Sequence, residues 1–263
     1  MSDPNTREIL DCCLKGFEWE GTPTGTVQTL PGVGNPAYVT GTNPSRAIFL
    51  IHDLFGWTFP NTRLLADHYA REANATVYLP DFFGGDVIEW EPVINERWEE
   101  VNAPKFIAPH TREIREPEIF AYARALREKH AKVGAIGFCY GGWAVFRLGS
   151  KGNADACGGK GLIDCAVAGH PTFLTEKDID EVAVPVQILA PEIDAAYTPE
   201  LKAYTFTSLQ KSGISFDYQH FPRAVHACFV RGDLRVKGER EAMVRGKNAA
   251  VGWFNQWFHD DLE

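Results

Sequence analysis

The chain has 263 residues, of which 44% are hydrophobic and 12% aromatic, and this composition supplies enough apolar side chains for a sizeable core. The net charge of −9 and the absence of a basic run argue against nucleic acid and anionic membranes as partners. The N-terminal residues show no signal peptide, and no apolar run reaches membrane-spanning length. We therefore expect a cytoplasmic protein.

The six cysteines form neither a C-x-x-C motif nor the cysteine and histidine spacing of a zinc site. Without a secretory signal we expect all of them to be reduced. They are Cys12, Cys13, Cys139, Cys157, Cys165 and Cys228. The chain contains no repeat or low-complexity linker, which favours a single domain over residues 1–263, with residues 1–15 as a loosely ordered N-terminal segment.

The first predicted elements are strands. Turn signals divide residues 16–40 into an antiparallel β meander, and the apolar runs at residues 47–51 and 76–79 are typical of strands buried in a parallel sheet. Between these two runs, Asn61 is predicted to cap a helix. The inward face of this helix is expected to carry Leu64, Leu65, His68, Tyr69 and Ala73.

Strands and helices then alternate to the end of the chain. Residues 113–132 predict a long amphipathic helix whose charges of alternating sign are typical of a solvated face. Strands are predicted at residues 163–168, 184–189 and 215–221, and helices at residues 143–148, 199–211 and 239–258. The pattern predicts an α/β fold with a mostly parallel central sheet flanked by helices on both faces. The N-terminal meander should lie antiparallel at one edge.

The most informative stretch is residues 133–143, V-G-A-I-G-F-C-Y-G-G-W. An apolar strand leads into the glycine-flanked Cys139, and a helix-compatible run follows at once. A G-x-nucleophile-x-G pattern in this setting is typical of the nucleophile elbow of α/β-hydrolases. The adjacent helix N-terminus offers N–H groups and a partial positive charge to a developing anion. The alternative is that Cys139 is a small buried hydrophobic residue.

An acid and a histidine follow the elbow in the chain order expected for this fold. Asp194 follows the strand at residues 184–189, and His226 lies beyond the strand at residues 215–221. A histidine can take the thiol proton, and a carboxylate can fix the orientation of that histidine. We therefore predict a triad of Cys139, Asp194 and His226. Glu192 and His220 remain as alternatives for the acid and the histidine.

An oxyanion site is predicted in the segment I-H-D-L-F-G-W, directly after the strand at residues 47–51. The N–H of Leu54 and the N–H of Tyr140 are the candidate donors. The alternative is an ordinary turn that contains an aspartate.

These motifs resemble the dienelactone hydrolase family (carboxymethylenebutenolidases). The resemblance rests on G-F-C-Y-G-G-W, H-D-L-F-G and H-A-C-F-V-R-G and covers most of the chain, and E-G-T-P-T-G-T resembles the fungal-type members in particular. It implies an α/β-hydrolase fold, no metal or organic cofactor, and hydrolysis of a lactone or ester through an acyl-cysteine. It also implies that Asp53 contacts the resting thiol, at a position that the family usually fills with the longer glutamate.

The resemblance also suggests substrate-binding residues. Bacterial members bind the substrate carboxylate with two arginines, and Arg231 is a candidate for one of them. The loop after residues 76–79, where the other is expected, has no arginine and is acidic and aromatic, which suggests an apolar lid. The predicted set is Arg231, Phe55, Trp57, Phe82, Phe83, Trp90, Trp143 and His170. For the aromatic residues, ordinary core packing is the alternative.

We therefore expect a monomeric cytoplasmic cysteine hydrolase that acts on a small lactone or activated ester. A broader esterase or thioesterase for apolar acyl groups is the nearest alternative, because the second arginine is missing. A non-catalytic small-molecule binder and a redox sensor at Cys139 are alternatives of other classes.

Overall fold

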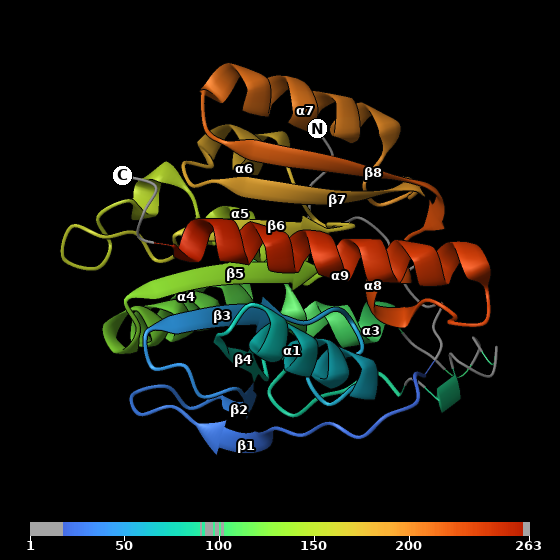
Figure 1. Ribbon diagram of the computed structural model, residues 1–263, viewed down its shortest axis with the longest axis horizontal. Coiled ribbons are helices and arrows are strands. Elements are labelled where there is room, and N and C mark those ends of the chain that lie inside the picture. The colour runs from blue at the N-terminus through green and yellow to red at the C-terminus, as the bar shows by residue number, and fades with distance from the viewer. Residues whose placement is uncertain (1–17, 90, 93–96, 98–99, 101–102, 260–263) are drawn as a thin grey trace.

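The computed structural model describes residues 18–89, 91–92, 97, 100 and 103–259. Its centre is an eight-stranded sheet with the order β1-β2-β4-β3-β5-β6-β7-β8 (Figure 1). The strands β3 to β8 run parallel, whereas β1 and β2 pair antiparallel at one edge. The bounds are β1 Thr26–Thr29, β2 Pro36–Thr40, β3 Arg46–Ile51, β4 Thr76–Pro80, β5 Lys132–Phe138, β6 Cys165–Gly169, β7 Val186–Ile193 and β8 Phe216–Val225. The predicted fold class and the edge position of the meander are confirmed.

Helices cover both faces of the sheet. Figure 1 shows α1 and α9 in front of the strands, and α4, α5 and α6 behind them. The bounds are α1 Pro60–Glu72, α3 Ala103–Ile107, η4 Ala108–His110, α4 Arg112–Lys129, α5 Gly141–Leu148, η5 Lys151–Asn153, α6 Glu176–Glu181, α7 Pro199–Ser212, α8 Cys228–Arg231 and α9 Lys237–Phe258. None of the helices among the described residues combines the length and the apolar character needed to cross a bilayer.

The central strands are apolar on both sides because helices cover both faces. Every residue from Ile48 to Ile51 on β3 is fully buried. On β5, Gly134 leaves room for α9, since a Cβ there would lie 2.6 Å from the ring of Phe254. The core is therefore continuous from α9 through the sheet to α4 and α5.

Two details of α1 differ from the prediction. Phe59, not Asn61, is the N-cap residue, and Asn61 lies in the first turn. Its buried amide instead accepts a hydrogen bond from the N–H of Trp19 (2.8 Å) and donates one to the carbonyl of Val230 (2.9 Å). His68 is exposed rather than inward. Tertiary hydrogen bonds to distant segments decided the role of Asn61, and local sequence does not contain them.

The long helix predicted at residues 113–132 is shorter. It ends at Lys129, and Lys132 already begins β5. Its charged residues do not all lie on a solvated face: Arg127 is only 7% exposed and donates hydrogen bonds to the carbonyls of Gly161 and Ala131. The prediction of a purely solvated charged face was therefore wrong for this arginine.

The last two strands are longer than predicted, and this extension positions the site. Beyond a register irregularity between Pro191 and Ile193, β7 and β8 pair again at Ile193 and Val225. Asp194 directly follows β7 and His226 directly follows β8, and the N–H of His226 donates to the carbonyl of Ile193 (2.9 Å). The two predicted triad members are thus neighbours because their strands end in register.

Candidate active site

Cys139 lies in the sharp turn between β5 and α5, and its backbone has a left-handed φ of +49°. Such a conformation is uncommon for a residue other than glycine and marks a strained turn. The turn is tight because glycine flanks it: a Cβ on Gly137 would lie 2.1 Å from the carbonyl oxygen of Gly141. A Cβ on Gly141 would lie 2.3 Å from the carbonyl oxygen of Ile51. This geometry is that of a nucleophile elbow.

Asp194 and His226 form a buried pair beside the elbow. Asp194 Oδ1 lies 2.9 Å from His226 Nδ1, and both side chains are fully buried. The same oxygen accepts hydrogen bonds from the N–H groups of Ala196 and Tyr197, each at 2.9 Å. The carboxylate is therefore fixed by its own turn and in turn orients the imidazole.

The pKa of His226 reflects the neighbouring thiol. Burial lowers it, but the negative charge of Cys139, the hydrogen bonds to Asp194 and Cys139, and the charge of Asp194 together raise the pKa of His226 to about 10. A histidine with this pKa is an imidazolium at neutral pH.

The alternative acid and histidine lie elsewhere. Glu192 is exposed, and its carboxylate accepts a hydrogen bond from the N–H of Arg223 (2.5 Å). His220 is also exposed. The structure brings together Cys139, Asp194 and His226, and it leaves both competitors outside this cluster.

The loop between β6 and α6 adds two side chains around Cys139. Thr172 Oγ1 lies 3.3 Å from Cys139 Sγ, within hydrogen-bond distance for sulfur. His170 is fully buried between His226, at 4.8 Å between ring centroids, and Phe229, on which it stacks at 5.4 Å. Burial lowers the pKa of His170 to about 4, so its ring is neutral.

Thr172 was not predicted from the sequence. His170 was predicted to face the pocket, and the structure places its ring close enough to Cys139 for the sulfur to influence its pKa. Neither ring nitrogen makes a hydrogen bond of ordinary geometry to another described residue. Among the described residues no carboxylate is hydrogen-bonded to His170 as Asp194 is to His226, so no acid orients its ring.

Asp53 and Arg231 form a second buried ion pair. Asp53 Oδ2 lies 2.7 Å from Arg231 Nε, and both side chains are fully buried. Asp53 Oδ1 accepts a hydrogen bond from the N–H of Phe55 (2.9 Å), and the guanidinium lies over the Phe55 ring at 4.2 Å. Burial raises the pKa of Asp53, Arg231 lowers it and Cys139 raises it. Both predicted residues therefore lie at the site, but they bind each other.

The loop that carries Leu54 is held by His52. His52 Nδ1 donates to the carbonyl of Asp53 (2.8 Å), and His52 Nε2 accepts from the N–H of Phe82 (3.3 Å). Burial lowers the pKa of His52 to about 4, so the ring is neutral and can donate from Nδ1 while it accepts at Nε2. The N–H groups of Leu54 and Tyr140 donate no backbone hydrogen bond within the described ranges. Tyr140 is the N-cap residue of α5.

The aromatic residues predicted for substrate binding are of two kinds. Phe55 packs against Phe59, and Phe83 packs against Phe106 and Tyr140, so these rings lie around the Leu54 and Tyr140 loops. Phe82 instead packs against Phe49 and Tyr122 in the core.

The predicted tryptophans also differ in setting. Trp57 is half-buried beneath the guanidinium of Arg63, 5.0 Å from its ring centroid. Trp143 is fully buried on α5, with the guanidinium of Arg112 4.9 Å from its ring centroid. Trp90 lies outside the described residues.

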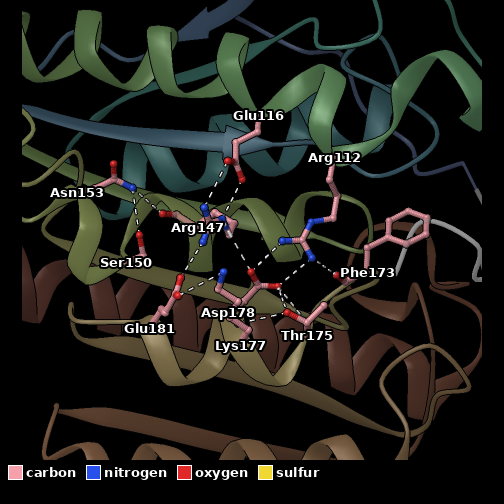
Figure 2. A network of polar contacts seen from close by, with 10 residues as sticks. All are labelled: Arg112, Glu116, Arg147, Ser150, Asn153, Phe173, Thr175, Lys177, Asp178 and Glu181. Carbon is pink, nitrogen blue, oxygen red and sulfur yellow. Dashed lines mark hydrogen bonds and ion pairs between the residues drawn. The ribbon is translucent and has the colours of Figure 1, made fainter. Parts of the chain in front are cut away.

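A polar network links α5, the helix that follows the elbow, to α4 and α6 (Figure 2). Asp178 of α6 is 3% exposed and accepts hydrogen bonds from both terminal nitrogens of Arg112, at 2.8 and 2.9 Å. It also completes a capping box with Thr175. Arg147 of α5 pairs with Glu116 of α4 and Glu181 of α6. The network therefore joins three helices on the same face of the sheet.

No cluster of three or more histidine, cysteine, aspartate or glutamate side chains suited to a metal ion is found among the described residues. Four cysteines are described, and none of them forms a disulfide with another described cysteine: Cys139, Cys157, Cys165 and Cys228. Cys12 and Cys13 lie outside the described part. The chemistry available at the site is that of a thiol, an imidazole, a carboxylate and backbone N–H donors.

Comparison with known proteins places this geometry in context. A sequence model of the dienelactone hydrolase family matches residues 35–258. The hydrolase pyvD of Aspergillus violaceofuscus is 27% identical over 251 residues, 94% of this chain and 96% of that protein. Dienlactone hydrolase 1 of Gibberella moniliformis is 24% identical over 265 residues, 98% of this chain and 97% of that protein. The crystal structure of dienelactone hydrolase from Anabaena variabilis shares the fold, with a TM-score of 0.61 at 17% identity, covering 90% of this chain and 98% of that one.

Proposed function

Because the chain belongs to the dienelactone hydrolase family and is a hydrolase, we propose that it cleaves a small lactone or activated ester through an acyl-enzyme on Cys139. The observation that carries the proposal is the placement of a cysteine on a strained elbow beside the buried pair of Asp194 and His226. A thiol in this position is activated by an adjacent base that a third group orients.

The reaction follows from these positions. The Cys139 sulfur attacks the substrate carbonyl, and the N–H groups of Leu54 and Tyr140 stabilise the oxyanion that forms. The carbon–oxygen bond of the ester or lactone then breaks, and His226 gives its proton to the leaving oxygen. In the second half, His226 takes a proton from water, the hydroxide attacks the thioester carbonyl, and the carbon–sulfur bond breaks to return the thiolate. Asp194 keeps the imidazole oriented in both halves.

A second candidate is an esterase for neutral, apolar acyl groups. The observation that favours it is the buried ion pair of Arg231 with Asp53, because an arginine bound to an internal carboxylate is less available to a substrate carboxylate. The segment after β4 contributes no other arginine before Trp90. The two candidates share the mechanism and differ in the charge of the substrate.

Intact-mass spectrometry after brief mixing with a dienelactone and with a neutral aryl ester tests both candidates. We expect a transient acyl adduct on Cys139, and we expect Cys139→Ala to form none and to lose turnover by about 10⁴-fold or more. Cys157→Ala, which changes a half-buried thiol outside the site, is the matched control. Faster adduct formation with the charged lactone favours the first candidate, and an adduct with only the neutral ester favours the second. Turnover that survives Cys139→Ala would contradict the mechanism.

A further inference from the structure

Residues 169–172, which begin at the last residue of β6, make three contacts with Cys139. The N–H of Cys139 donates to the carbonyl of Gly169 (3.1 Å), and the N–H of Thr172 donates to the carbonyl of Cys139 (2.8 Å). The third contact is the 3.3 Å distance from Thr172 Oγ1 to Cys139 Sγ. Pro171 packs so closely on the elbow helix that a Cβ on Gly142 would lie 2.5 Å from its Cβ. The segment and the elbow are therefore closely packed and joined by hydrogen bonds.

The hydroxyl of Thr172 is a candidate donor to the sulfur. The residue is 8% exposed, and no other hydrogen bond of this hydroxyl is found among the described residues. Buried hydroxyl groups are almost always hydrogen-bonded, and a bond to a charged acceptor is stronger than a neutral one. At this distance the thiol or the hydroxyl can be the donor, but a sulfur that has given its proton to His226 can only accept, so the hydroxyl of Thr172 then donates.

The other groups around the sulfur are titratable, and Thr172 is a neutral side chain that can donate a hydrogen bond to it. Asp53 cannot donate to a thiolate while it is ionised, and its two oxygens already contact Arg231 and the N–H of Phe55. The titratable groups that face Cys139 are His226 after β8, His170 after β6 and Asp53 after β3, with Asp194 and Arg231 behind them. Among these groups His226 is the cation next to the sulfur, and Thr172 adds a neutral donor.

We propose that Thr172 is a catalytic residue whose hydroxyl donates a hydrogen bond to the Cys139 thiolate and so stabilises the resting nucleophile. The proposal rests on the proposed function, because it concerns the sulfur that attacks the substrate. Resting stabilisation by a neutral donor differs from the contact with an acid that the family resemblance suggested for Asp53. Thr172 donates a hydrogen bond but does not transfer its proton, so its hydroxyl is unchanged at the end of the reaction.

The test measures the ionisation of Cys139 without a substrate. The rate of alkylation of Cys139 by iodoacetamide, followed by peptide mass so that other thiols do not interfere, is recorded against pH for wild type, Thr172→Val and Thr172→Ser. We expect the inflection of Thr172→Val to lie about one pH unit higher, so that its rate below the inflection falls about tenfold. Thr172→Ser retains the hydroxyl and should keep the inflection of wild type.

Two results would overturn the proposal: identical inflections for wild type and Thr172→Val, or a lower plateau with an unchanged inflection, which is what a merely structural role predicts. If Thr172→Val does not fold, as judged by circular dichroism, Thr172→Ala removes the hydroxyl without adding a methyl group and takes its place. Because alkylation needs no substrate, a protein that hydrolyses nothing would refute the proposed function and still test Thr172.

Discussion

Asp194 accepts three hydrogen bonds on one carboxylate oxygen, from His226 and from two backbone N–H groups of its own turn. The two backbone bonds fix the carboxylate independently of its contact with His226. The charge on this carboxylate also favours the imidazolium form of His226. Orientation and charge are therefore two separable contributions of one residue.

The substitution Asp194→Asn removes the charge of this side chain and keeps an oxygen that can accept hydrogen bonds. The amide oxygen can still accept from the backbone, but it is neutral, so the pKa of His226 should fall from about 10 toward its ordinary value. We expect kcat/KM to fall between about 10²-fold and 10⁴-fold, with the alkaline limb of the pH profile moved to lower pH. Steady-state kinetics from pH 6 to 10 measure both effects. Glu192→Gln, which changes the exposed neighbouring acid, should stay within about twofold of wild type; an equal loss there would contradict the assignment.

The sequence was sufficient to place Cys139, Asp194 and His226 at one site, since each follows a strand end in the chain order of the fold. It was not sufficient for Thr172, whose contact depends on a loop with left-handed backbone at His170 (φ 38°) and Phe173 (φ 58°). The pairing of Asp53 with Arg231 was also beyond it, because Asp53 follows β3 and Arg231 ends α8, 178 positions later in the chain. Strand order is readable from sequence, whereas loop conformation is not.

At the scale of elements, the polar network in Figure 2 stabilises α6, a helix whose sequence has no apolar pattern. The α6 helix has six residues, E-K-D-I-D-E, and was not predicted. Its capping box and the two bonds from Arg112 to Asp178 stabilise it instead. The same network reaches α5 through Arg147, and the hydrogen bond from Arg112 to the carbonyl of Phe173 reaches the loop that carries Thr172.

Asp178→Asn should therefore destabilise the protein more than removal of a peripheral charge does. Asp178 is 3% exposed, and breaking its pair with Arg112 should lower the free energy of unfolding by about 2–4 kcal/mol. The control is Glu181→Gln, because Glu181 also pairs with Arg147 but its side chain is 34% exposed; we expect a loss below about 1 kcal/mol. Urea denaturation compares the two variants. Equal losses would show that burial of Asp178 does not determine the strength of the network.

At the scale of the whole molecule, burial keeps four histidines neutral. Burial lowers the pKa of His52 and of His170 to about 4, and it also lowers the pKa values of His110 and His130. In the unfolded chain a histidine binds a proton near pH 6.5. Between that pH and about 4 the unfolded state therefore binds more protons than the folded state, and stability falls as the pH falls.

Urea denaturation at pH 7, 6, 5 and 4.5 measures this dependence. His52 alone should contribute a slope of up to about 1.4 kcal/mol for each pH unit below 6.5, so His52→Gln should show a shallower decline than wild type. His220→Gln changes an exposed histidine and serves as the control, with the decline of wild type expected. Parallel slopes for wild type and His52→Gln would show that His52 is not kept neutral in the folded state.

The architecture could be predicted because buried parallel strands are continuous apolar runs and because turn signals bound the meander. The ends of elements were less predictable: β7 and β8 extend to Ile193 and Val225, through residues that include Pro191 and Pro222. β8 pairs with β7 alone, so its other edge tolerates a proline. The extension depends on pairing between segments about 30 positions apart, which a local window does not contain.

The crowded elbow also sets limits on protein engineering. Gly137, Gly141 and Gly142 each face backbone or proline atoms within 2.1 to 2.5 Å of where a Cβ would stand. Randomised libraries should therefore recover almost no active clones mutated at these three positions, whatever substrate is used for selection. Diversity is better directed at Phe55 and Phe83, which lie on the segments after β3 and β4 and not in the turn that carries Cys139. New substrate preferences in this scaffold should evolve from its loops, with the elbow inherited unchanged.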